Sequence, residues 1–147
     1  MAKYQSKQFT GQKPVVLPDD ATAEWATIDI EFPSTAILAN DLLQLVDIPI
    51  SLKVLDWAIQ FPDIDSGGSA LAFSLGVENA GGTDLGSEVW GTALAAGAAG
   101  ATVRNALAAC AQGDSTVVRR LSMKCTTPAT TYAGAGKVGQ VILLLQG

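Results

Sequence analysis

The sequence predicts an all-β fold, mainly a β-sandwich or jelly-roll-like domain with an extended N-terminal arm and one or two short helical turns. Three observations predict it. Short segments alternate apolar and polar side chains, clusters of Gly, Pro and Asp separate these segments, and seven or eight such segments recur at the spacing typical of a sandwich. The length of 147 residues suits one domain. We therefore expect an arm over residues 1–24 and a single β-sandwich domain over residues 25–147.

The arm is predicted from composition. Residues 1–24 are rich in Lys, Gln and Ser, contain Pro14 and Pro18, and have one brief apolar run. From Trp25 the pattern changes to a period of two, because Ile28, Ile30 and Phe32 alternate with polar residues. This pattern is typical of a half-buried strand that ends at Pro33.

The middle of the chain predicts three further strands. Segments 42–48 and 52–61 are separated by Pro49, which indicates a turn or an edge. The dense turn signal of residues 63–68 precedes alternation over residues 71–77.

The last third is less regular. Its glycines oppose a helix while its alanines favour one, so we expect only one or two helical turns around residues 87–95. Segments 103–110, 117–125 and 137–145 complete the strands, and a hairpin of residues 103–110 with 116–125 across residues 111–115 is a hypothesis for the first two.

Charge is distributed unevenly along the sequence. Three lysines and no acid lie within residues 1–13, thirteen acids and one base within residues 14–100, and five bases and one acid within residues 101–147. Two outcomes follow from this layout: either opposite ends of the molecule carry opposite fields, or folding mixes the segments into an ordinary surface.

Composition also excludes several classes of function. The net charge of −5 argues against a general nucleic-acid binder, which needs a concentrated basic face. The most apolar stretch, residues 92–101, has half the length of a membrane span. The first nine residues lack the apolar core of a secretory signal, so we expect synthesis and retention in the cytoplasm.

Catalytic motifs are weak throughout. The chain has no histidine, which removes Ser-His-Asp and Cys-His arrangements. Asp63 and Asp65 are the closest carboxylate pair for glycoside hydrolysis, and they also match the first positions of a calcium loop. The calcium match then fails, because Ser74 stands where a bidentate carboxylate is required. We expect an Asx-type turn, with Asp63 and Asp65 only as weak metal candidates, and we expect no cofactor and no enzymatic activity.

The glycine-rich segment 134–139 has dinucleotide-fingerprint spacing, but a strand instead of a helix is predicted after it. We therefore interpret it as a flexible lead into the last strand. The predicted hairpin places the two cysteines, Cys110 and Cys125, too far apart to bond, so free buried thiols are expected.

Several of these segments resemble a known family. The segments are 39–41, Ile48-Pro49, 54–56, 63–68, 71–76, 126–129 and 132–134. They look like small head proteins of tailed bacteriophages encoded beside the major capsid gene, described as capsid decoration or cement proteins. The chain departs from that pattern at Ile50-Ser51, where relatives often have Ala-Gly, and in the small side chains after Ser87.

The resemblance implies a structural virion protein on the outer surface of an icosahedral head, made in the host cytoplasm, with the major capsid protein as partner. It also implies a homo-oligomer, with a trimer favoured and a dimer possible. The arm would then lie across a neighbouring subunit. The candidate contact residues are Tyr4, Lys7, Phe9, Lys13, Val15, Val16, Leu17, Trp25 and Trp90, while Trp57 is expected in the core.

Two alternatives remain open at this point. One is a tail or head–tail structural component of the same particle. The other is a surface β-sandwich module that binds carbohydrate or a receptor, which tryptophans exposed in one cleft would favour over burial in the sandwich.

Overall fold

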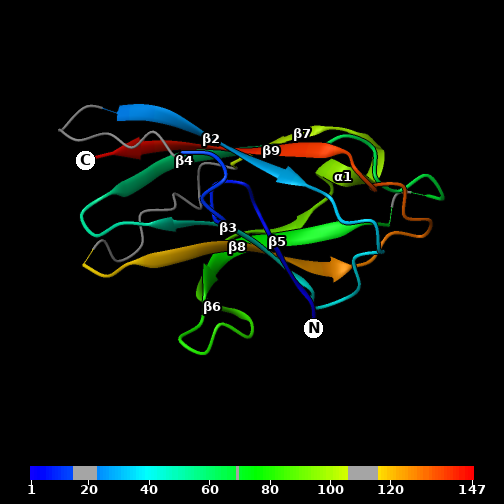
Figure 1. The fold of residues 1–147 in the computed structure, drawn as a ribbon, viewed down its shortest axis with the longest axis horizontal. Helices are drawn as coiled ribbons and strands as arrows, with labels where there is room; N and C mark the ends of the chain where they lie inside the picture. The colour runs from blue at the N-terminus through cyan, green and yellow to red at the C-terminus, as the bar shows by residue number, and fades with distance from the viewer. Residues whose placement is uncertain (15–22, 69, 106–115) are drawn as a thin grey trace.

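The computed structural model describes residues 1–14, 23–68, 70–105 and 116–147, and it confirms an all-β sandwich (Figure 1). One sheet has the order β1 (Lys3–Gln5), β3 (Leu42–Ile48), β8 (Arg119–Thr127), β5 (Ala72–Glu78) and β6 (Leu85–Leu94). The other has the order β2 (Ala23–Glu31), β9 (Val138–Gln146), β4 (Lys53–Gln60) and β7 (Thr102–Arg104).

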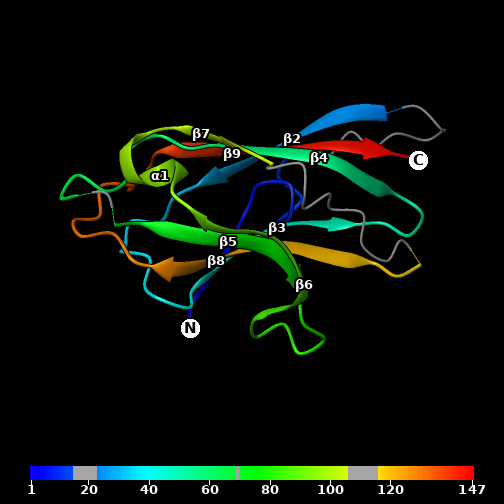
Figure 2. The ribbon, with the colours of Figure 1, turned by 180° about the vertical axis from the view of Figure 1, so that it is seen from behind.

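The strand order is that of a jelly roll. Consecutive strands from β2 to β9 alternate between the sheets except β5 and β6, which pair within one sheet, and the layers have the orders 2-9-4-7 and 3-8-5-6. The short strand β1 adds to the β3 edge, in parallel with β3. Figures 1 and 2 show the two layers facing each other, with the β5–β6 connection protruding below them.

The core lies between the sheets and follows from the period-two patterns. Ile28 and Ile30 of β2 are fully buried while their neighbours in the sequence are at least partly exposed. Phe61 forms edge-to-face contacts with Phe32 at 5.0 Å and with Phe73 at 5.9 Å between ring centroids. The alternating residues of the two sheets therefore meet in a single apolar cluster.

The prediction of helical turns around residues 87–95 is wrong. Residues 85–94 form strand β6, and one short helix, α1 (Ala96–Ala99), follows it. Trp90 is 3% exposed in the core, and Gly91 lies beside it, where an added Cβ would be 3.0 Å from the Trp57 ring. Burial of Trp90 and the close approach at Gly91 thus outweigh the helical tendency of the alanines.

The predicted hairpin of segments 103–110 and 117–125 is also wrong. Strand β7 pairs with β4, with Val103 opposite Ile59, whereas β8 lies in the other sheet between β3 and β5. Alternation made each segment recognisable as a strand but carried no information about its partner. The remainder of the first segment, residues 106–110, lies outside the described residues.

Within the described part of the chain, no helix is long and apolar enough to cross a membrane.

Candidate functional site

The first functional feature is the N-terminal strap, which we define as residues Ala2–Lys13. The sequence predicts an extended arm here, and the structure places the strap along the side of the sandwich formed by β2 and β3. Its first part forms β1 on β3, and Ser6 then becomes fully buried. The Ser6 Oγ donates to the Leu45 carbonyl and accepts from the Phe9 N–H at 2.9 Å. The strap is therefore anchored in its middle by a small polar side chain.

The second half of the strap covers the free edge of β2. Gln8 accepts a hydrogen bond from the Asp29 N–H through Oε1 at 2.9 Å and donates to the Thr27 carbonyl through Nε2 at 3.3 Å. The Lys7 N–H donates to the Asp29 carbonyl at 3.1 Å. These groups satisfy backbone atoms of β2 that would otherwise present an open sheet edge.

Ion pairs fix the same half of the strap. The Lys13 Nζ lies 2.6 Å from the Asp29 carboxylate, and the Lys7 Nζ lies 3.6 Å from Glu31. The hydrogen bond from Lys13 is the main cause that lowers the pKa of Asp29, opposed by partial burial of the carboxyl group. Exposed pairs of this kind contribute roughly 0–1 kcal/mol each. Their role is to orient the strap against an acidic strand.

Phe9 connects the strap to the outer face of the other sheet. The Arg120 guanidinium lies 4.9 Å from the centre of the Phe9 ring, a cation–π distance. Arg120 also pairs with Asp47 through both carboxylate oxygens, at 2.8 and 3.2 Å. This pairing is the main cause that raises the pKa of Arg120.

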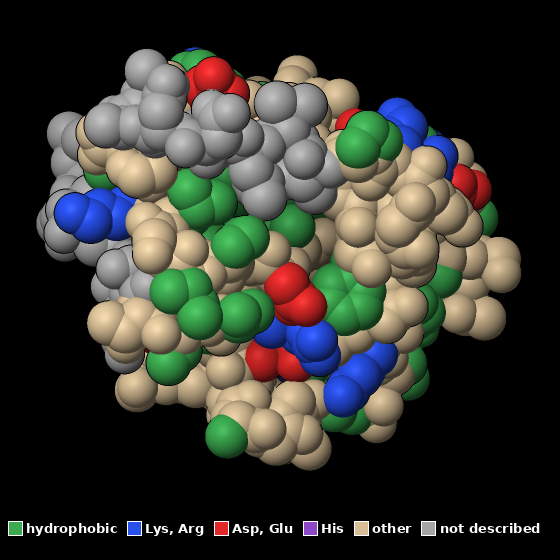
Figure 3. Space-filling model, turned by 60° about the vertical axis from the view of Figure 1, so that its left-hand side comes forward, with side chains coloured by type: hydrophobic (Ala, Val, Ile, Leu, Met, Phe, Trp, Pro, Cys, Tyr) green, Lys and Arg blue, Asp and Glu red, His purple; other side chains and the backbone are tan. Residues whose placement is uncertain are grey.

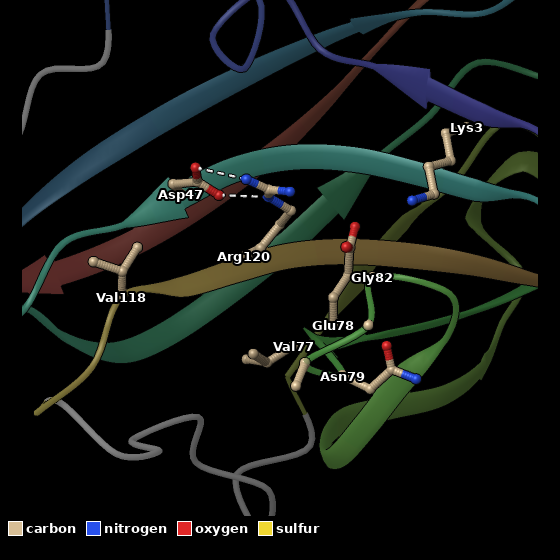
Figure 4. A pocket seen from close by; sticks show the side chains of 10 residues that line it. Lys3, Asp47, Val77, Glu78, Asn79, Gly82, Val118 and Arg120 are labelled. Atoms are coloured by element: carbon tan, nitrogen blue, oxygen red, sulfur yellow. Dashed lines mark hydrogen bonds and ion pairs between the residues drawn. The ribbon is translucent and has the colours of Figure 1, made fainter.

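A polar hollow of about 390 Å³ adjoins this ion pair (Figure 4). Lys3 of β1 and Glu78 of β5 point into it, and the Asp47–Arg120 pair forms its wall. The Glu78 Oε1 accepts hydrogen bonds from Gln44 and Ser122, at 2.8 and 2.6 Å. Its lining also includes Val77, Asn79, Ala80, Gly81, Gly82 and Val118. Such a hollow can receive a polar side chain of a partner.

Exposed aliphatic side chains lie at the adjacent end of the sandwich. Ile50, Val117 and Val118 are 55%, 50% and 58% exposed. Ile50 follows β3, and the two valines precede β8. Because Ile48 at the end of β3 pairs with Arg119 at the start of β8, these two segments lie next to each other. We call these three residues the aliphatic end. Figure 3 shows hydrophobic side chains gathered beside a cluster of acidic and basic ones. Apolar area next to a polar rim is typical of a protein–protein contact surface.

The three tryptophans separate into two classes. Trp57, predicted to be in the core, is 2% exposed and confirms that prediction. Trp90 is also buried, and its Nε1 donates to the Glu88 carboxylate at 3.1 Å. Trp25 is 54% exposed on β2, opposite Leu144 of β9. Of the two tryptophans considered as contact residues, Trp25 is exposed and Trp90 is buried.

The Asp63–Asp65 segment forms the expected Asx-type turn. Asp63 accepts the Asp65 N–H at 3.1 Å, and the Asp65 carboxylate accepts N–H groups of Gly67, Thr131 and Leu71 at 3.3, 3.0 and 3.3 Å. The hydrogen bond from Thr131 is the main cause that lowers the Asp65 pKa. Asp65 thus joins two loops. Within the described ranges no group of three or more His, Cys, Asp or Glu side chains could hold a metal ion.

The charge segregation of the sequence is cancelled in the fold. Lys7 and Lys13 from the N-terminal segment and Arg120 and Lys124 from the C-terminal segment pair with acids of the middle segment. The acids are Glu31, Asp29, Asp47 and Asp84, respectively. For these charges, folding mixes the segments, as the second of the two expected outcomes states.

The structure brings together part of the predicted contact set. Tyr4, Lys7, Phe9 and Lys13 lie in one strap, while Trp25 lies on the outer side of β2 and Trp90 in the core. Val15, Val16 and Leu17 lie outside the described residues. Sequence reasoning missed Ser6, Gln8 and the aliphatic end. The adjacent valines Val117 and Val118 at the start of a strand were a usable signal for the last of these, since a strand with one solvated face should alternate.

Comparison with known proteins gives structural matches. No protein-family model matches the sequence, and no curated protein matches it. A chain in the capsid of Ralstonia phage GP4 superposes with a TM-score of 0.80 and 26% identity over 99% of each chain. A chain in the capsid asymmetric unit of cyanophage Pam1 has a TM-score of 0.59 and 13% identity over 92% of this chain and 93% of that one. The second likeness concerns the fold alone.

Proposed function

We propose that this protein is a structural virion protein that binds the outside of an icosahedral phage head and stabilises contacts between capsomers as a decoration or cement protein. The observation that carries the proposal is the match to a chain of the Ralstonia phage GP4 capsid, which extends over 99% of both chains at 26% identity. The major capsid protein is the proposed partner, and the protein acts on the capsid surface as a homo-oligomer, a trimer or a dimer, without catalysis.

The aliphatic end is the proposed capsid-facing surface. It combines apolar area at Ile50, Val117 and Val118 with the neighbouring polar hollow, which offers both charge signs through Lys3 and Glu78. Burying one aliphatic side chain contributes roughly 1.5–3 kcal/mol. A few such contacts on each of many symmetry-related copies are enough to hold a shell together.

The burial of the tryptophans favours this role over carbohydrate binding. A sugar-binding cleft needs aromatic faces open to the ligand, whereas Trp57 and Trp90 are 2% and 3% exposed. Trp25 is exposed, but the other two side chains belong to the core. The arrangement supports a scaffold that binds through its surface.

Co-sedimentation tests the proposal. Purified protein, with and without residues 1–20, is mixed with mature capsids from its own source that lack it. Saturable binding at a stoichiometry that matches a symmetry class supports a cement protein. Absence of binding at every salt concentration refutes it, and binding to isolated tails instead identifies a tail or head–tail component.

A surface variant tests the capsid-facing end. Val118→Asp places a charge in the aliphatic end and should weaken capsid binding about tenfold or more, because an apolar contact is replaced by a desolvated carboxylate. Leu38→Asp is the matched control. Leu38 is 61% exposed near Asn40, whose N–H binds the Cys125 carbonyl at the far end of β8. Equal binding by both variants would assign the contact to another surface.

A further inference from the structure

One side of the sandwich is closed by the N-terminal strap, and the opposite side is open. The strap bonds to β3 and to β2, so these two strands lie on the same side of the molecule. The sheet orders then place β6 and β7 together on the other side, where each is the outermost strand of its sheet (Figure 2). No described main-chain group pairs with the outer edge of either strand. A partner can therefore reach both edges.

A hollow of about 400 Å³ opens between these two edges. It is lined mainly by apolar groups of β6 and by the Trp57 ring of β4, and Arg104 of β7 also lines it. Ligand sites typically have volumes of about 300–1,000 Å³. Val89 of β6 is 41% exposed and Arg104 is also exposed, so the hollow is open to solvent. An apolar group of a partner can enter it.

The Trp57 indole gives the hollow an unpaired donor. Trp57 is 2% exposed, and its Nε1 has no hydrogen-bond acceptor in the described part of the chain. The Cζ2 and Cη2 atoms of the ring lie 3.0 Å from the position that a Cβ on Gly91 would occupy. Cζ2 belongs to the same edge of the indole as Nε1, so this edge is turned toward β6. Because buried donors are almost always paired, an occupant that brings an oxygen acceptor would complete the site.

The β7 edge supplies main-chain groups beside the hollow. The Asn105 N–H donates to the Trp57 carbonyl of β4 at 3.1 Å. Main-chain groups of successive residues in an antiparallel strand point to alternate sides, so those of Arg104 and Thr102 point away from β4. An open edge of this kind binds the main chain of an extended peptide, and a neighbouring pocket selects one of its side chains.

We propose that the hollow between β6 and β7 binds an extended segment of the capsid protein, which pairs with the β7 edge and inserts an apolar side chain. This inference rests on the proposed function, which supplies the source of the segment. Arg104 adds a preference for charge, because it forms no ion pair within the described residues. The segment therefore carries an acidic residue next to the apolar one.

A second copy of this chain offers no suitable segment among its described strand edges. The β2 edge is covered by the strap, and the pairing of β6 with β5 is interrupted by register shifts, which distort that edge. The β1 strand carries Lys3 and β7 carries Arg104, so either would bring a second base to the site. A segment of a different protein avoids this repulsion.

A ribosome-displayed library of random decapeptides tests the site without capsids. The library is selected on the parent protein, and the enriched peptides are measured on two variants. Thr102→Pro removes an outward N–H, which an edge strand tolerates, and Thr102→Val keeps that N–H as its control. Val89→Asp places a charge in the hollow. Its control is Val138→Asp, since Val138 is 45% exposed on β9.

Peptides with an apolar residue next to an acid are the expected result of this selection. Their affinity should fall about fivefold with Thr102→Pro, through loss of one main-chain hydrogen bond, and about tenfold or more with Val89→Asp. The two controls should bind like the parent. Absence of enrichment overturns the proposal, and so do enriched peptides that bind all variants equally. Binding of arrayed glycans that Val89→Asp abolishes would assign the hollow to carbohydrate and overturn it as well.

Hydrogen exchange of the unmodified chain tests the source of the segment. The amides of Thr102 and Arg104 point outward and should exchange rapidly in the free protein, and they should become protected about tenfold or more on capsids. Capsid binding without this protection overturns the inference and keeps the cement role. Protection that appears in the free protein as its concentration rises assigns the site to a second copy and also overturns it. Peptide binding that depends on Val89, in a protein that binds no capsid, would support the peptide site and reject the proposed function.

Discussion

The Ser6→Ala substitution separates docking of the strap from stability of the sandwich. Ser6 is fully buried and its hydroxyl makes two hydrogen bonds, one to the Leu45 carbonyl and one from the Phe9 N–H. Each such bond contributes about 1 kcal/mol, and the alanine leaves both partners unsatisfied, so we expect strap docking to weaken by about 2 kcal/mol. Since every 1.4 kcal/mol is a factor of ten, strap opening should increase roughly 30-fold.

Hydrogen exchange measures that increase. The amides of Asp29 and Leu42 bind the strap, through the Gln8 side chain and the Ala2 carbonyl, so their exchange should accelerate about 30-fold. Amides in β4 and β9 should not change. The control is Ser66→Ala, because Ser66 is exposed and its hydroxyl lies 3.5 Å from the Thr131 carbonyl. Uniform acceleration over the whole domain would refute the reasoning, because the strap would then be part of the global folding unit.

Three further predictions concern the sandwich itself. Asp65→Asn should lower the Tm at neutral pH, and the difference in Tm from the parent protein should shrink as the pH falls. The folded pKa of Asp65 lies below its unfolded value, so the carboxylate stabilises the fold fully above the unfolded pKa and loses this effect as the pH falls through the folded pKa. Thermal melts across a range of pH measure this difference. Gly139→Ala should lower the free energy of unfolding by about 1–3 kcal/mol in chemical denaturation, since the new Cβ would lie 2.4 Å from the Phe61 ring. In the control Gly81→Ala the new Cβ meets nothing closer than 3.7 Å, so the free energy of unfolding should change by less than about 0.5 kcal/mol. Burial raises the pKa of the Cys125 thiol to about 11, so a thiol reagent at mildly alkaline pH should modify Cys125 only after denaturation, and peptide mass spectrometry would report early modification if the side chain were accessible.

Sequence periodicity located strands well but could not assign their partners. Segment 42–48 is predicted with the bounds observed for β3, because its apolar residues and the following Pro49 are local signals. Segment 103–110 is misassigned to a hairpin, since its first residues pair with β4, more than forty positions away. The residues 85–94 form a strand for a tertiary reason, namely that Trp90 fills the core. Pairing and burial of this kind depend on the folded context, which periodicity does not encode.

The candidate site shows the same division. A basic, acid-free N-terminal segment could be recognised from composition, and Phe9, Lys7 and Lys13 do make specific contacts. Ser6 and Gln8 could not be recognised, because a serine and a glutamine acquire their roles only from the carbonyls and amides that the fold places beside them. Polar anchors of this type carry no distinctive sequence signal.

The ion pairs show how charges that are segregated in the sequence are brought together in the fold. Four bases of the terminal segments, Lys7, Lys13, Arg120 and Lys124, pair with acids of the middle segment. The terminal segments supply β1, β7, β8 and β9, and β8 and β9 lie between strands of the middle segment, so bases and acids distant in sequence become neighbours. These charges pair within the fold, between the strap and β2 and between β3 and β8. The aliphatic end offers a partner exposed apolar side chains such as Val117 and Val118, whose contacts are insensitive to ionic strength.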